Sequence, residues 1–237
     1  MPCKQDASPF SGYTAQNVTI DQDIPTFDIP TQVISVGGWI VVQQRIDNST
    51  DFGRNWAEYR DGFGVYNANY WMGLEKIHQL TISDQYKLRI EVYYPTLQQW
   101  RSAEYSSFVV DHEPNSYALY VSGFSGDADN GLLWSADSTK MHNGMSFSTP
   151  DVDNDEDPKR HCANIFSSGW WFNACNYVDL NGHIEAPNSA HNYFEYYISG
   201  VKTAVGMSRM MIQLVNHGLV PQIVTSPPLR KWYTTEG

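Results

Sequence analysis

The chain has 237 residues, of which 41% are hydrophobic and 14% aromatic, and its formal net charge is −11 at pH 7. This length and composition favour one large or two small globular domains and exclude an intrinsically disordered chain. The 15 Lys and Arg residues form no basic patch, so neither nucleic acid nor an anionic membrane is an expected partner. No apolar run reaches the roughly 18 residues of a transmembrane helix, and the start MPCKQDASPF lacks the features of a signal peptide, so a soluble chain is expected.

The first half of the chain predicts one strand followed by two helices. Apolar residues alternate with other residues after a glycine pair, which predicts a strand at 37–47. Apolar residues then recur every three or four positions and predict two amphipathic helices, at 49–64 and 73–81. The first of these helices has Thr50 or Asp51 as its expected N-cap.

Strands dominate the segments that follow the helices. In YKLRIEVYY, residues 86–94, apolar and charged residues alternate as in a half-buried antiparallel strand. Further strands are predicted at 103–111, 117–126 and 208–215, the last with Met210, Ile212 and Leu214 facing the core. These elements indicate an α+β fold with a mixed or antiparallel sheet.

The region from residue 127 to about residue 197 is rich in Asn, Asp, Gly, Ser and aromatic residues and has no sustained periodicity. So long an irregular stretch inside a compact domain is typical of a functional region that a metal ion or a disulfide holds in place. We therefore expect a polar lead-in at 1–36, a main domain at 37–214 that includes this loop-rich subdomain, and a proline-interrupted extension at 215–237.

The three cysteines cannot all pair within one chain. Cys162 and Cys175 enclose a loop of about a dozen residues, and a disulfide across such a loop would stabilise the fold by about 3 kcal/mol. This pairing would indicate an oxidising compartment, and so do the N-x-T glycosylation sequons at Asn17 and Asn48, although such sequons also occur as ordinary polar turns. Cys3 would then be free or paired outside this chain.

The segment DVDNDEDPKRHC, residues 151–162, crowds five carboxylates into seven positions. Ca²⁺ takes roughly six to eight oxygen ligands, which a tight acidic loop supplies. The EF-hand pattern fails here, because Glu156 stands where that loop needs glycine and Cys162 where it needs glutamate. We expect a calcium loop of another type; the alternative is an exposed acidic turn without a ligand. Zinc is less favoured because His161 and Cys162 have no further ligands at zinc spacing.

Several motifs occur in a fixed order along the chain: GGW, QQRIDNSTDFGRNWAEYRDGFG, YWMGLEKIHQLT, HNGMSFST, DVDND and HCANIFSSGWWFNACNYVDLNG. Together they resemble the fibrinogen C-terminal, or fibrinogen-like, domain from about residue 9 to residue 214, and they are similar to those of invertebrate fibrinogen-related proteins, ficolins and tachylectins. The resemblance implies an α+β globular domain with a central, mostly antiparallel, twisted sheet, a few short helices and a loop-rich subdomain that binds calcium and ligand.

Followed position by position, the resemblance assigns the side-chain calcium ligands to Asp153 and Asp155. Backbone carbonyl ligands fall near Asp157 and Lys159. This chain has one more residue before Cys162 than the family pattern, so the two carbonyl positions stay open.

The resemblance also implies a shallow ligand pocket around Cys175, held by the disulfide, with a cis peptide between Ala174 and Cys175. Two positions depart from the members that bind acetyl groups, since Phe172 replaces a tyrosine and Asn176 replaces a histidine. For each aromatic residue the alternative is that it packs the irregular subdomain. The expected ligand-binding residues are Trp171, Phe172, Cys175, Asn176, Asp179, Tyr193, Tyr196 and Tyr197.

No enzymatic activity is expected, because the histidines are scattered and no serine motif resembles a nucleophile; His142 is expected to be structural. The main hypothesis is a secreted, calcium-binding recognition protein of innate immunity that binds glycans or acetylated groups on microbial or host surfaces. Weak single sites imply a homo-oligomer formed in a longer protein. The alternative is an adhesion or signalling module that docks a cell-surface protein, or a microbial or parasite ligand, through the same face; the departures at Phe172 and Asn176 favour it. A peptide-amine pocket is less favoured, because Asp179 is the only obvious carboxylate nearby.

Overall fold

A computed structural model describes residues 16–17, 34–36, 38–133, 137–183 and 194–215. Its main feature is a nine-stranded sheet in which the strand pairs are antiparallel. The strand order is β1 (Gln16–Asn17), β2 (Ile34–Val36), β3 (Trp39–Arg45), β11 (Met207–Leu214), β6 (Tyr86–Tyr94), β7 (Gln99–Val110) and β8 (Leu119–Gly126). Two short strands, β4 (Phe63–Gly64) and β5 (Tyr70–Trp71), extend from β3. The predicted α+β class with a mostly antiparallel central sheet is confirmed.

The core lies on one face of this sheet. In β6 every second side chain is buried, and Leu88, Ile90 and Val92 have no exposed surface. The neighbouring strand β11 contributes Met210 and Ile212 to the same core. The prediction that Leu214 also faces inward is wrong: the side chain is 38% exposed, because it ends the strand beyond the edge of the core.

Two short helices, α1 (Trp56–Asp61) and α2 (Leu74–Ser83), lie on the same side of the sheet as the loop-rich region. The first is shorter than predicted, and its N-cap is Asn55 rather than Thr50 or Asp51. The Asn55 side chain accepts a hydrogen bond from the amide of Glu58, whose carboxylate accepts one from the amide of Asn55, and this capping box fixes the start of the helix. The second helix agrees with the prediction.

The segment 1–36, expected to be an N-terminal lead-in or subdomain, contributes strands to the main sheet. β1 pairs with β2, and β2 pairs with β3, so residues on both sides of the expected boundary at residue 36 belong to one sheet. These strands are only two and three residues long, which is too short for a periodic pattern to be visible in the sequence.

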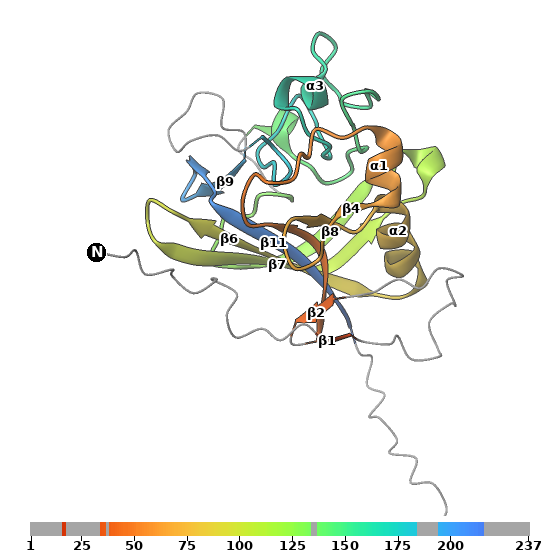
Figure 1. The fold of residues 1–237 in the computed structure, drawn as a ribbon. Helices are drawn as coiled ribbons and strands as arrows, with labels where there is room; N and C mark the ends of the chain where they lie inside the picture. The colour runs from red at the N-terminus through yellow and green to blue at the C-terminus, as the bar shows by residue number, and fades with distance from the viewer. Residues whose placement is uncertain (1–15, 18–33, 37, 134–136, 184–193, 216–237) are drawn as a thin grey trace, which may run out of the picture.

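The loop-rich region contains little regular structure. It holds the helix α3 (Cys162–Phe166), the 3-10 helix Ser138–Lys140 and a hairpin of β9 (Glu195–Ile198) and β10 (Val201–Ala204). A second 3-10 helix, Glu113–Asn115, precedes β8. Figure 1 shows α3 and the surrounding loops gathered above the sheet. This arrangement places the predicted site on one side of the domain.

Candidate functional site

The disulfide predicted between Cys162 and Cys175 is present, with the two Cα atoms 5.5 Å apart. Cys162 is the first residue of α3, and Cys175 follows a cis peptide bond with Ala174, as the resemblance implied. The amide of Ala174 donates a hydrogen bond to the carbonyl of Thr139 at 2.8 Å. The disulfide therefore closes this loop, and a backbone hydrogen bond next to Cys175 connects the loop to Thr139.

His142 joins the two sides of the loop that carries Cys175. Its Nδ1 lies 2.8 Å from the carbonyl oxygen of Trp171, while Nε2 lies 2.9 Å from the amide of Val178 and 3.2 Å from the amide of Tyr177. The ring is fully buried, and burial lowers the pKa of His142 to about 4. It is thus neutral, with the proton on Nδ1 donated to Trp171, and the expectation that it is structural agrees with this geometry.

Strand β3 anchors the segment that follows Tyr177. Gln43 donates from Nε2 to the carbonyl of Leu180 at 2.7 Å, and Arg45 donates from Nη1 to the carbonyl of Gly182 at 2.9 Å. Both side chains are buried. Sequence periodicity does not reveal such polar anchors, because β3 presents them at positions that also fit an ordinary half-buried strand.

The acidic loop is folded around its own backbone amides. The carboxylate of Asp155 accepts hydrogen bonds from the amides of Cys162 at 2.7 Å and Asp157 at 2.9 Å. The amide of Asp155 lies 3.4 Å from Oδ1 of Asp153. Burial and the neighbouring Asp153 raise the pKa of Asp155. Two carboxylates therefore lie close together in a position where a cation would stabilise both.

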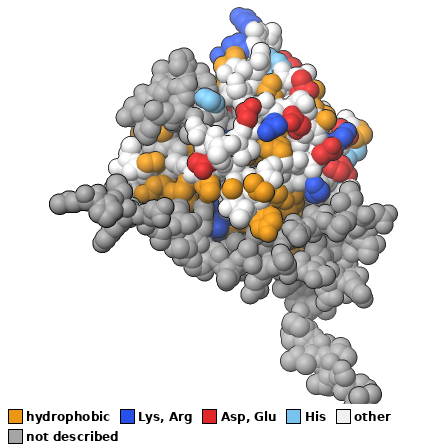
Figure 2. Space-filling model, viewed as in Figure 1, with side chains coloured by type: hydrophobic (Ala, Val, Ile, Leu, Met, Phe, Trp, Pro, Cys, Tyr) orange, Lys and Arg blue, Asp and Glu red, His pale blue; other side chains and the backbone are white. Residues whose placement is uncertain are grey.

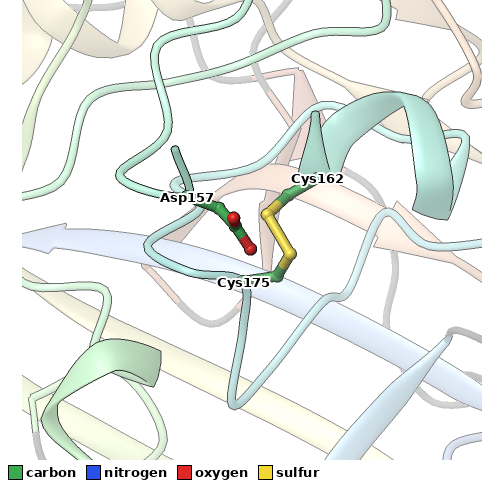
Figure 3. Close-up of side chains that lie close together, drawn as sticks. All are labelled: Asp157, Cys162 and Cys175. Carbon is green, nitrogen blue, oxygen red and sulfur yellow. A yellow bond between two sulfur atoms is a disulfide. The ribbon is translucent and has the colours of Figure 1, made fainter. Parts of the chain in front are cut away.

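The donor set of this loop fits a hard cation. Asp153 and Asp155 supply carboxylate oxygens, and in the described part of the chain no hydrogen bond uses the carbonyl oxygens of Asp157 or Lys159. All of these candidate metal ligands are oxygen atoms, as Ca²⁺ requires. A thiolate metal centre does not fit: Figure 3 shows the Asp157 carboxylate beside Cys162 and Cys175, but both sulfurs belong to the disulfide.

Four residues expected to bind ligand have no surface exposed to solvent. Trp171, Phe172, Asp179 and Tyr196 are completely buried, so in this structure they cannot contact a ligand directly. Trp171 donates from Nε1 to a backbone carbonyl, and Phe172 stacks on Phe166 with ring centroids 5.6 Å apart. The packing alternative describes these aromatic side chains, which form the support beneath the surface.

Asp179 is the least expected of these buried groups because it is ionisable. Its carboxylate accepts hydrogen bonds from the hydroxyl of Ser168 at 2.6 Å and from the amide of Asn181 at 2.9 Å. Burial raises the pKa of Asp179 to about 7, against the opposing effect of these two donors. It therefore stabilises the loop from inside rather than offering a carboxylate to a ligand.

Three of the expected residues keep some exposed surface. Cys175 is 6% and Asn176 is 8% exposed, and Tyr197 is half-buried. Between them lies Tyr177, which sequence reasoning missed; its ring stacks on that of Tyr197 with centroids 3.6 Å apart. The sequence did contain one signal for this residue, because Tyr177 lies two residues after Cys175, inside the motif that resembles the fibrinogen-like family.

The other sequence predictions lie at the margins of this site or outside it. Tyr193 lies outside the described residues, and so does the side chain of Asn17. Asn48 lies in the exposed turn after β3, where its side chain is accessible to solvent. Glycosylation at both asparagines stays a prediction.

The exposed face shown in Figure 2 carries acidic and basic side chains intermingled over its upper right part, with hydrophobic side chains in a band below them. No patch of basic side chains alone is visible on the described part of this face. No helix among the described residues is both long and apolar enough to cross a membrane.

Comparison with known proteins agrees with this architecture. Residues 13–214 match the family described as fibrinogen beta and gamma chains, C-terminal globular domain. Human fibroleukin is 38% identical over 170 residues, which cover 70% of this chain and 37% of fibroleukin. Bovine angiopoietin-4 is 36% identical over 190 residues, which cover 76% of this chain and 35% of the relative. Human tenascin-R is 34% identical over 184 residues, or 78% of this chain and 13% of tenascin-R.

Solved structures give the same result. The fibrinogen-like globe domain of human ANGPTL2 superposes with a TM-score of 0.71 at 30% identity, covering 87% of this chain and 94% of that domain. A lamprey fibrin D-dimer, complexed with the peptide ligand Gly-His-Arg-Pro-amide, superposes with a TM-score of 0.64 at 30% identity and covers 84% of this chain and 68% of that one. The chain spans little more than a third of the length of fibroleukin and less of the other two curated relatives. It belongs to the fibrinogen C-terminal domain family.

Proposed function

We propose that this chain is a secreted, non-enzymatic recognition domain that binds a protein ligand at the surface around Cys175, next to a calcium ion held by the acidic loop. The observation that carries this proposal is the burial of the side chains expected to line an acetyl pocket. Trp171, Phe172 and Tyr196 are fully buried, so a ligand can reach only the half-buried Tyr197 and the small exposed parts, 8% each, of Asn176 and Tyr177. A shallow, partly aromatic surface suits a protein partner.

The relatives favour the same reading. Among them are angiopoietins and tenascin-R, and the lamprey fibrin structure holds a peptide. This chain spans only part of such proteins, so oligomerisation through another region, which raises the apparent affinity of a weak site, belongs to the proposal. Innate immunity, the setting first expected, has no support among these relatives.

Calcium belongs to the proposal through the geometry of the acidic loop. Asp153 and Asp155 would bind the ion with their carboxylates, and the carbonyl groups of Asp157 and Lys159 would complete the protein ligands. A bound cation would fix the loop whose residue Asp155 accepts the amide of Cys162. The recognition surface and the ion would thus be coupled through one hydrogen bond and the disulfide.

Glycan binding is a second candidate function because of the side-chain amide nitrogen of Asn176. The Nδ2 group of Asn176 is buried and has no hydrogen-bond partner among the described residues. An amide donor in this place is suited to an acetamido carbonyl, although Asn176 is only 8% exposed.

A cell-binding experiment separates the two candidates. We expect the labelled chain to bind cells in calcium, to lose binding after the cells are treated with protease, and to keep it after enzymatic removal of their glycans. EDTA should weaken binding. Binding that is lost on glycan removal and competed by N-acetylglucosamine would contradict a protein ligand and establish a lectin. Binding to no cell type or glycan would contradict both candidates.

A further inference from the structure

A slot of about 300 Å³ lies beside the proposed recognition surface. It is formed where the end of β8, the following loop, Tyr177 and the turn between β9 and β10 meet. Its lining consists of Phe124, Ala128, Asp129, Asn130, Tyr177 and Gly200. This set contains aromatic rings and a carboxylate but neither lysine nor arginine, and we call it the aromatic–acidic slot.

The Tyr177 ring, which forms part of the aromatic lining of the slot, is held in place by its neighbours. The ring of Tyr177 stacks on that of Tyr197, with 17° between the ring planes. The hydroxyl of Tyr94 donates to the carbonyl of Tyr197 at 3.0 Å, which fixes the backbone beneath this pair. The stack therefore offers a preorganised aromatic surface, and ordering it on binding costs little entropy.

The carboxylate in the slot is also held in place. Asp129 accepts hydrogen bonds from the amides of Ser199 at 2.9 Å and Gly200 at 2.7 Å, which close the β9–β10 turn. A carboxylate has about four lone-pair positions, so two remain for a ligand. Burial and, to a smaller extent, the negative charge of Asp129 raise the pKa of Tyr177 to about 12. The carboxylate therefore acts electrostatically on this aromatic residue.

Asn130 contributes to the slot a side-chain oxygen that accepts no hydrogen bond from the described residues. Its Oδ1 is buried and has no hydrogen-bond partner in the part of the chain that the structure describes, while the side chain as a whole is only partly buried. Asn130 is one of the residues that line the slot. An unpaired buried acceptor is costly, so a ligand that brings a donor gains this energy on binding.

We propose that the aromatic–acidic slot binds a basic side chain of the protein partner, with arginine preferred over lysine. A guanidinium group is planar and can stack on the Tyr177 ring, and it carries five donors and no acceptor. Asp129 and Asn130 offer acceptors for those donors. The net charge of −11 favours a basic partner at longer range. This inference rests on the proposed protein-binding function and adds the chemistry of one contact.

Arg101, which lies in the neighbouring strand β7, does not line the slot. It donates from Nη1 to the carbonyl of Asp127. The slot is therefore available to a cation supplied from outside the described part of the chain.

The test uses two small probes that differ in charge but have nearly the same shape: N-acetyl-arginine amide and N-acetyl-citrulline amide. NMR titration of the full chain should show the arginine probe shifting the signals of Tyr177 and Gly200, with a dissociation constant in the millimolar range. The citrulline probe should bind at least about tenfold more weakly, because it lacks the cation. Added salt should reduce this difference.

Two variants with opposite expected effects sharpen the test. Asn130→Asp adds a second carboxylate and should tighten arginine binding severalfold, whereas Tyr177→Leu should weaken it by a similar factor. Unchanged melting temperatures would show that both variants fold. Equal binding of the two probes, no arginine binding, or binding unaffected by either variant would overturn the inference. N-acetylglucosamine displacing the arginine probe would instead indicate a sugar site.

The two proposals can fail separately. Cell binding that depends on calcium and on cell-surface protein, in a chain that does not bind the arginine probe, would leave the proposed function intact and overturn the slot. Binding of the arginine probe without any cell binding would support the slot and contradict the proposed function.

Discussion

Replacing both Cys162 and Cys175 with serine should lower the free energy of unfolding by about 3 kcal/mol. The disulfide closes a loop with a sequence separation of 13 residues, and cross-links of this span restrict the unfolded chain by about that amount. Urea unfolding at equilibrium, followed by tryptophan fluorescence, measures the change. Cys3→Ser is the matched control and should have little effect. A loss below about 1 kcal/mol would contradict the view that the disulfide holds this loop.

The same double substitution should weaken calcium binding, if the acidic loop holds the ion. The amide of Cys162 donates to the carboxylate of Asp155, so releasing Cys162 from the disulfide frees one anchor of the proposed ligand. Coupling between two sites is reciprocal, so calcium should in turn protect the disulfide against a reducing agent. This protection is measurable as a slower rate of reduction by dithiothreitol with calcium than with EDTA.

His142→Ala should be equally damaging, with a loss of about 3 to 5 kcal/mol. It removes a buried ring and leaves the carbonyl of Trp171 and the amides of Tyr177 and Val178 without their partner. His142→Gln is the matched variant, because its side-chain amide can donate to Trp171 and accept from Val178. It should recover about half of the loss. Equal losses in both variants would show that volume, rather than hydrogen bonding, decides the effect.

The stability that depends on His142 should also vary with pH. Its pKa in the folded protein is about 4, below the ordinary value of 6.5, so the unfolded chain binds a proton more readily between these values. The contribution is complete above pH 6.5 and is lost as the pH falls toward 4, by about 3 kcal/mol in total. The raised pKa of Asp179 acts in the opposite direction, but it is common to the wild type and the variant. The difference between their unfolding free energies at pH 7 and pH 4.5 therefore isolates His142.

Helices and strands were predictable from the sequence where one of their faces is buried, because burial makes apolar residues recur at a regular spacing. The alternation in β6 and the apolar face of α2 follow directly from residues such as Leu88 and Leu74, which are completely buried. The start of α1 was misplaced because several residues before it can cap a helix. Only the capping box between Asn55 and Glu58 decides among them, and it depends on side-chain geometry.

The disulfide beside the site was predictable from the sequence, but the exposure of the site residues was not. The disulfide and the acidic loop are local in sequence, so the spacing of Cys162, Cys175 and the aspartates indicated them. Whether Trp171 or Tyr196 faces solvent depends on what packs against them from distant segments. Tyr196, for example, donates to the backbone of Asp129, 67 residues earlier in the chain. Such contacts leave no local signal.

Calorimetric titration of calcium into the full chain tests the central claim most directly, since the proposed recognition surface depends on the acidic loop. We expect the wild type to bind one ion, Asp153→Asn to bind it at least about tenfold more weakly or not at all, and Glu156→Gln to bind it as the wild type does. Glu156 is an exposed carboxylate of the same loop to which no ligand role is assigned, so it controls for net charge. Absence of binding in the wild type, or an equal loss in both variants, would contradict the account.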